Sequence, residues 1–156
     1  MLSRGNSVLS YQIKFWRECI KPTLNEALKR TPQNKLDWAP RKGMITLGQV
    51  FLHIAECSDW WYDEVMKGNT AIELAKGKCP SKRVITRHLN THWNRMERFF
   101  AEAPRVLDKK YKVVGGRRTF HPTGIWIFTH LLEHDLHHRS QINQYLRILG
   151  ITPPEI

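Results

Sequence analysis

The sequence predicts an all-α protein folded as a four-helix bundle. Four long stretches place apolar residues at steps of three and four, the period of a helix that packs along one face. Turn and capping residues separate these stretches, and no segment indicates a convincing sheet. With 156 residues, of which 41% are hydrophobic and 25% charged, the chain has the size of one domain with a substantial core. We therefore expect residues 1–156 to form a single domain.

The first two helices are predicted from their periods and their ends. The first covers about residues 7–29, and Pro22 within it predicts a kink or a break because its ring displaces one backbone hydrogen bond. After a loop, Thr46 is placed to cap a second helix that runs to about Lys67. Gly68 then predicts the end of that helix.

A crossover leads to the third helix, and we expect a short turn of helix within it at residues 70–76. Ser81 is placed to cap the third helix, which should end at Ala103 because Pro104 follows. The helical period then lapses, and residues 113–120 predict a small hairpin that turns at its two adjacent glycines.

The last of the four predicted helices is the longest. Thr123 opens it, and it should run to Leu149 with Gly150 as a left-handed cap. The following Pro153 and Pro154 prevent any continuation.

The bulk properties exclude some classes of protein. No apolar run approaches the roughly 18 residues that span a bilayer, and the first residues lack a secretory signal, so we expect no membrane association and a cytoplasmic location. The three cysteines have irregular spacing, which indicates neither a disulfide framework nor a cysteine zinc site. The net charge of +11 favours anionic partners in general. Because the lysines and arginines are scattered, we do not expect nucleic acid to be the partner.

Histidines provide the strongest functional pattern. Four of the eight lie between residues 130 and 138. On a helix, His134 and His138 fall within the apolar face one turn apart, which is the spacing that lets a helix chelate a transition ion. His130 and His137 fall at the edge of that face. Other side chains of this helix, among them Asp135 and Arg139, are expected to meet water.

A structural interpretation competes with the metal site. Two core histidines could each be satisfied by a hydrogen bond, and His-x-x-x-His pairs also occur by chance. Burying two neutral imidazoles without partners is unfavourable, however, and one divalent ion satisfies both. The residue pattern alone leaves the two interpretations evenly balanced.

The second helix supplies a candidate third ligand, His53. Cys57, one turn later, could replace it or join it, although a small buried hydrophobic role is the commoner one for cysteine. Trp60 and Trp61 are interpreted as packing residues rather than walls of a site. Three more histidines have other expected places, the core or the surroundings of the site for His92, the surface for His88 and a loop for His121.

These residues together resemble a known family. The pattern consists of His53 followed by a tryptophan-rich stretch and of His134-x-x-x-His138-Arg139-x-Gln141-Ile142 in the last helix. It resembles the DinB/YfiT-like bundle family of metalloproteins over nearly the whole chain. The resemblance implies an up-down-down-up bundle, a divalent metal held by His53, His134 and His138, and a homodimer. Ser140 departs from the glycine that the family commonly has there, which affects local packing and leaves the ligands unchanged.

The ligand set determines the expected chemistry. Three neutral imidazoles leave at least one coordination position open, which is typical of catalytic sites. All-nitrogen ligation favours zinc or nickel, then iron or cobalt, and disfavours magnesium and calcium. Such an ion can lower the pKa of bound water to about 7 or bind a thiol as thiolate.

The resemblance supports a metal-dependent enzyme without naming its substrate, because the family includes thiol-dependent S-transferases that use low-molecular-weight thiols and many members with no assigned reaction. Together with the chemistry of the ion, it leads us to expect a small-molecule substrate and either a thiol-dependent S-transferase or a hydrolase. The general base is not assigned among Glu56, Asp59, Glu64 and Glu133. The alternative is a non-enzymatic basic stress-response bundle that binds nucleic acid or a protein partner around a structural metal.

Overall fold

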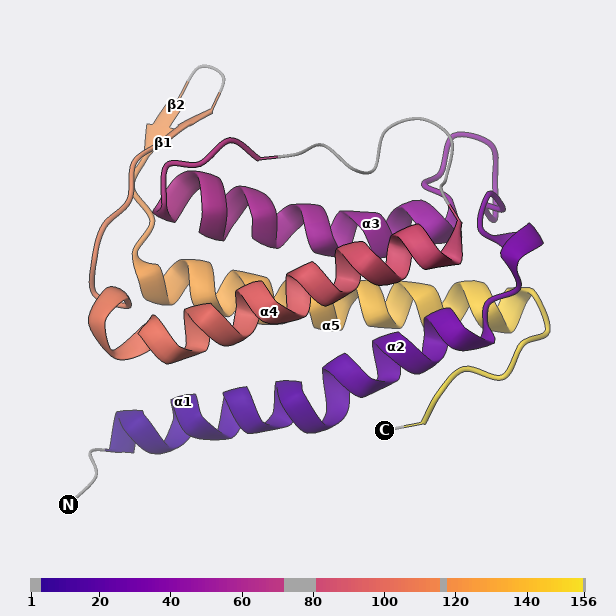
Figure 1. Cartoon of the computed structure of the whole chain (residues 1–156), viewed down its shortest axis with the longest axis horizontal. Helices are drawn as coiled ribbons and strands as arrows, with labels where there is room; N and C mark the ends of the chain where they lie inside the picture. Colours follow the sequence, from indigo (N-terminus) through magenta and orange to yellow (C-terminus); the bar gives the residue numbers. More distant parts are fainter. Residues whose placement is uncertain (1–3, 72–80, 116–117, 156) are drawn as a thin grey trace.

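Four helical rods lie side by side along the long axis of the protein (Figure 1). The computed structural model describes residues 4–71, 81–115 and 118–155. Its helices are α1 (Arg4–Phe15), α2 (Lys21–Arg30), α3 (Leu47–Ser58), α4 (Lys82–Val106) and α5 (Gly124–Ile148). The first rod consists of α1 and α2, the second begins with α3, and α4 and α5 are the third and the fourth. A two-stranded hairpin of β1 (Val113–Gly115) and β2 (Arg118–Phe120) joins α4 to α5. The all-α bundle is therefore confirmed.

The first rod bends just before its proline. A π-helical turn, Trp16–Ile20, joins α1 to α2, and the Lys21 amide donates to the Trp16 carbonyl five residues earlier. Pro22 follows this turn in the first turn of α2. Because proline lacks an N–H and its ring crowds the carbonyl four residues before it, the widened turn accommodates the ring without ending the rod. The break predicted at Pro22 is thus a π turn.

The predicted helix ends are largely confirmed. Thr46 forms a reciprocal capping box with Gln49 at the start of α3, and the Thr123 hydroxyl accepts from the Trp126 amide at the start of α5. Gly68 and Gly150 have the positive φ angles of helix-terminating glycines. Ser81 occupies the N-cap position of α4 but forms no capping hydrogen bond through its side chain.

One predicted helix type and one predicted helix end differ from the structure. The second rod continues past α3 as a π-helical stretch, Asp59–Met66, rather than as regular α-helix. α4 continues through Pro104 to Val106, because proline removes one backbone bond near a helix end where few bonds remain to be lost. The helical turn expected at residues 70–76 falls mostly outside the described residues, and the residues that are described there, 70 and 71, are not helical.

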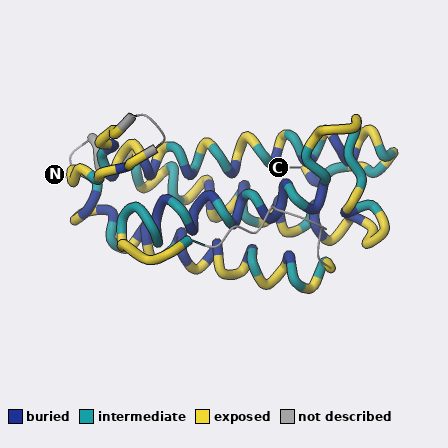
Figure 2. Tube along the Cα trace, turned by 90° about the horizontal axis from the view of Figure 1, so that it is seen from above, coloured by how far each residue is buried: buried dark blue, intermediate teal, exposed yellow. Residues whose placement is uncertain are grey.

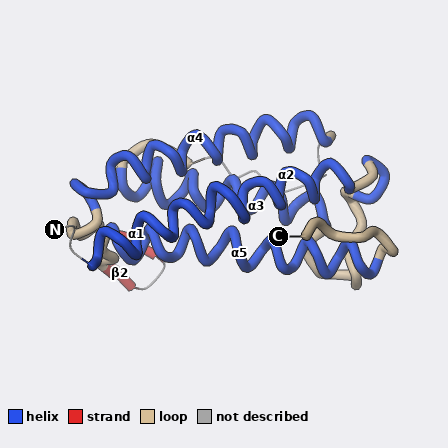
Figure 3. Tube along the Cα trace, turned by 90° about the horizontal axis from the view of Figure 1, so that it is seen from below, coloured by secondary structure: helices blue, strands red, loops and turns tan. Residues whose placement is uncertain are grey.

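The hairpin is confirmed where it is described. Val113 pairs with Phe120 and Val114 with Thr119 in an antiparallel register. Gly116, the second of the two predicted turn glycines, lies outside the described residues. The hairpin lies at the end of the bundle where the chain begins, and the loop between α2 and α3 lies at the opposite end (Figure 3).

The core runs the length of the bundle between the rods. Buried positions recur along α2, α3, α4 and α5, and exposed positions alternate with them (Figure 2). The largest fully buried side chains include Trp16, Phe51, Phe99 and Phe128, which come from all four rods. No described helix is both long and apolar enough to cross a membrane.

Gly124 sets the close approach between the start of α5 and the end of α4. A Cβ atom on Gly124 would lie 2.1 Å from the carbonyl oxygen of Val106 and 2.9 Å from the Cα atom of Leu107. We expect Gly124→Ala to destabilise the fold by about 1–3 kcal/mol, because backbone atoms must move. Thermal denaturation should show a clear drop in Tm, whereas Ser140→Ala, at an exposed position of the same helix, should change it little. Equal Tm values for the two variants would contradict this packing.

Candidate metal centre

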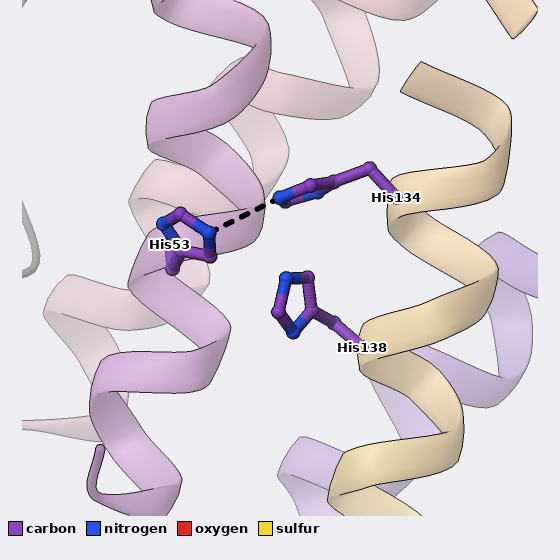
Figure 4. A group of neighbouring side chains, drawn as sticks. All are labelled: His53, His134 and His138. Carbon is purple, nitrogen blue, oxygen red and sulfur yellow. Dashed lines mark hydrogen bonds between the residues drawn. The ribbon is translucent and has the colours of Figure 1, made fainter. Parts of the chain in front are cut away.

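Three histidines from two facing helices converge inside the bundle. His53 comes from the middle of α3, and His134 and His138 come from adjacent turns of α5. Their rings point toward one another across the space between the helices (Figure 4). One ring nitrogen from each histidine lies within 4.8 Å of the other two. The structure therefore brings together the three residues that the sequence selected.

The spacing of the donor atoms suits a transition ion. The Nε2 atoms of His53 and His134 are 3.2 Å apart. Two nitrogens bound to a tetrahedral zinc ion at its usual bond length would be about 3.3 Å apart. The His138 ring centre lies 4.3 Å from that of His134 and 4.9 Å from that of His53. The donor set thus needs only small adjustments to hold one ion.

Hydrogen bonds on the outer side of two rings select their tautomers. His53 Nδ1 lies 3.4 Å from Glu56 Oε2, and His138 Nδ1 lies 2.7 Å from Gln141 Oε1. Because both oxygens are acceptors, Nδ1 carries the proton and the lone pair is left on Nε2. Carboxylate and carbonyl partners of this kind orient metal-binding histidines. His134 Nδ1 is buried and has no hydrogen-bond partner among the described residues.

Burial favours the neutral forms of His134 and His138. It lowers the pKa of His134 to about 2, with a smaller contribution from the neighbouring imidazoles of His138 and His53. Burial also lowers the pKa of His138, partly offset by the hydrogen bond to Gln141. Neutral imidazoles have free lone pairs at ordinary pH, so protons compete weakly with a metal ion for these donors.

The lowered pKa of His134 predicts a loss of stability in acid. An unfolded chain protonates this imidazole near its ordinary pKa of about 6.5, whereas the folded protein resists protonation. The free energy of unfolding is therefore not reduced by His134 above pH 6.5, and it decreases as the pH falls below 6.5 because protonation favours the unfolded chain. At pH 5 the loss from this group is about 2 kcal/mol. Tm of the metal-free protein should fall between pH 7.5 and pH 5, and His134→Gln should weaken that dependence. A Tm that does not change with pH would contradict the buried neutral imidazole.

The other histidines have separate places. His130 is half-buried on α5, with its ring stacked on Trp126 at an interplanar angle of 11°. His137 and His121 are exposed, and His88 is partly buried rather than fully on the surface. His92 is in the core, as expected for one of its two predicted places.

Cys57 packs beside the centre without joining it. Its sulfur lies 3.9 Å from His130 Nε2, and it does not belong to the group of donor atoms formed by the three histidines. Burial raises the pKa of this thiol well above its ordinary value, so the group stays a neutral thiol. The structure therefore supports the interpretation of Cys57 as a small buried residue.

Asp135 and Arg139 correct the expectation that these side chains meet water. Asp135 is fully buried, and only 8% of Arg139 is exposed. Asp135 lies four residues after the buried Leu131, and Arg139 lies three residues before the buried Ile142, so each falls near a buried residue on the helix surface. α5 thus buries a second stripe beside the histidine face, because it contacts the first rod as well as α3 and α4.

A buried polar network behind the histidines was missed by the sequence analysis. Asp135 Oδ2 accepts from Trp16 Nε1 at 2.8 Å and lies 2.9 Å from His92 Nε2. His92 Nδ1 in turn lies 2.6 Å from the Ser58 hydroxyl, which also accepts from Arg95. Each rod contributes to this network, so it holds α5 in register beside its neighbours. One signal in the sequence could have indicated that Asp135 is buried, because it lies one helical turn after the apolar Leu131.

A cleft opens beside the three histidines. It has a volume of about 490 Å³. Its described lining consists of His53, Glu56, Cys57, Trp60, Trp61, Ala71, His130 and His134. Trp61 is packed in the core, as the sequence analysis expected, and yet both tryptophans also form walls of this cleft. Two of the three converging histidines are therefore accessible to a small molecule.

Comparison with known proteins places this fold and these residues in a family. A model of the DinB family matches residues 9–156. Solved structures of DinB-like proteins from Bacillus cereus and Bacillus subtilis resemble the chain, with TM-scores of 0.70 and 0.68 and sequence identities of 18% and 15%. The first match covers 93% of this chain and 95% of the other, and the second covers 96% of each. No curated protein matches the chain. Because the family model spans nearly the whole sequence, the protein belongs to the DinB family.

Proposed function

We propose that His53, His134 and His138 hold one divalent transition ion with an open coordination position, and that the protein is a metal-dependent enzyme acting on a small molecule. The observation that carries the proposal is the convergence of three imidazole nitrogens within 4.8 Å beside a cleft. Zinc or nickel suits this nitrogen donor set best, and iron or cobalt is also compatible with it. A bound ion supplies Lewis acidity, which polarises a substrate or favours the thiolate form of a thiol.

The carboxylates near the site favour thiol transfer over hydrolysis. Hydrolysis needs a general base within hydrogen-bond reach of the attacking water. Glu56 is the carboxylate among the described lining of the cleft, and it lies at Nδ1 of His53, on the opposite side of that ring from the Nε2 donor. Glu56 is thus placed to orient His53 rather than to take a proton at the open position.

The transfer reaction that we propose joins a low-molecular-weight thiol to an electrophile. The thiol releases its proton to solvent water, its sulfur forms a bond to the electrophilic carbon, and the leaving group departs with the electron pair of the broken bond. The three histidines would hold the ion that binds the thiol sulfur, and the adjacent cleft would bind the electrophile. Cys57 is not the nucleophile in this scheme, because burial keeps its thiol protonated by raising its pKa.

The proposal is tested with protein purified without a histidine tag. Metal analysis should find a divalent transition ion, and its removal by a chelator should stop thiol consumption in a screen of electrophiles. Adding zinc or nickel back should restore the activity, and His138→Ala should abolish it in all preparations. Thiol consumption that persists equally in the metal-free protein and in His138→Ala would refute a metal-dependent enzyme.

A further inference from the structure

The described lining of the cleft beside the histidines contains aromatic side chains and no lysine or arginine. We infer that it binds a flat aromatic group without negative charge, and that this group belongs to the substrate that reacts beside the ion. This inference rests on the proposed function, because it concerns the same site. It adds the chemical class of the substrate, which three histidines alone do not determine.

Aromatic rings form the walls of the cleft and are held firmly in place. The Trp60 and Trp61 ring centres are 4.4 Å apart at an interplanar angle of 68°. Trp61 is 5% exposed and also contacts the ring of His130 at 5.4 Å. The Trp126 ring stacks on His130, and its centre lies 5.1 Å from that of Trp61. Packed rings of this kind offer apolar faces to a ligand with little loss of conformational freedom.

The charge of the lining disfavours anions. The chain has 25 lysines and arginines, yet none of them is among the described residues that line this cleft. Two other clefts of the same protein do contain arginines, Arg30 in one and Arg139 with Arg147 in the other. The charged residue that does line this cleft is the acidic Glu56. A phosphate or carboxylate group would therefore lose its hydration and meet a negative side chain.

The size and position of the cleft suit a small aromatic substrate. A volume of about 490 Å³ lies within the range of small-molecule sites and accommodates one or two fused rings. Because His53 and His134 form part of the wall, a ring that rests against Trp60 places its substituents next to the donor nitrogens. The geometry therefore joins an aromatic binding surface to the proposed reaction centre.

The test compares two probes of similar shape and different charge, 2-naphthol and naphthalene-2-sulfonate, by calorimetric titration of the metal-free protein, in which no bound cation attracts the sulfonate. We expect 2-naphthol to bind about tenfold tighter than the sulfonate, and Trp60→Leu to weaken 2-naphthol binding by a similar factor. Glu56→Gln should reduce the difference between the two probes. Trp38→Leu is the matched control, because Trp38 packs on Tyr145 outside the cleft, and it should leave binding unchanged.

Each result separates this inference from the proposed function. Equal or tighter binding of the sulfonate, or 2-naphthol binding that survives Trp60→Leu, would overturn the inference even if metal analysis finds the expected ion. Selective 2-naphthol binding that is lost in Trp60→Leu supports the inference. If a separate sample retains no zinc after loading, the inference still stands and the proposed metal-dependent function fails.

Discussion

Replacing His134 or His138 with alanine is expected to abolish most of the divalent-metal binding of this protein. Each substitution removes one of three nitrogen donors that lie within 4.8 Å of one another. Two remaining donors leave too few protein ligands for a tightly held transition ion. The ratio of metal to protein after dialysis should fall from about one ion per chain to near zero.

Two other histidines serve as matched controls. His137 is exposed on the same helix, next to a proposed ligand, and His88 lies on α4 outside the donor group. His137→Ala and His88→Ala should both keep their metal. If His88→Ala loses the ion as completely as His134→Ala, the assignment of ligands is wrong.

Replacing Asp135 with alanine is expected to cause the largest loss of stability among the single substitutions considered. The change removes the oxygen that accepts from Trp16 Nε1 and contacts His92 Nε2, and both partners are buried. Leaving such groups unpaired costs about 3–5 kcal/mol of the free energy of unfolding. Urea denaturation followed by tryptophan fluorescence should show this as a lower midpoint.

Asp135→Asn provides the comparison for that experiment. Asparagine keeps the shape and one oxygen acceptor, so its loss of stability should be clearly smaller than that of alanine. An alanine variant as stable as the original protein would show that the network of Asp135, His92 and Ser58 does not hold the bundle together.

The helices of the bundle could be predicted because their signals are local. Thr46, Thr123 and Gly150 act within one turn of the chain, and the structure confirms each at its expected helix end. The π-helical form of the first rod could not be predicted, because Pro22 indicates a kink or a break without specifying the backbone form that accommodates it. Continuation of α4 through Pro104 likewise depends on tertiary packing outweighing a local preference.

The candidate site could be predicted in part. Helical phase placed His134 and His138 on one inward face. His53 was a candidate from the second helix that the resemblance to the family then supported, and the structure brings it to the same point. Asp135 was misplaced because α5 buries two stripes and a buried carboxyl group resembles a surface one in sequence. The position of Trp61 both in the core and in the cleft wall could not be predicted, because it depends on how the helices pack together. Thiol use and the homodimer stay predictions.

The visible spectrum of the cobalt(II)-substituted protein tests the central claim, an open three-histidine centre, most directly. Cobalt accepts the same nitrogen donors as zinc, and its spectrum reports the atoms that surround it. With His53, His134 and His138 as ligands, at least one position is left for an added molecule. We predict that azide or a thiol shifts the spectrum of the original protein, whereas His134→Ala, which should retain almost no cobalt, shows no such spectrum. A spectrum that does not respond, together with unfolding when the metal is stripped, would contradict the open centre and show an ion that only holds the bundle together.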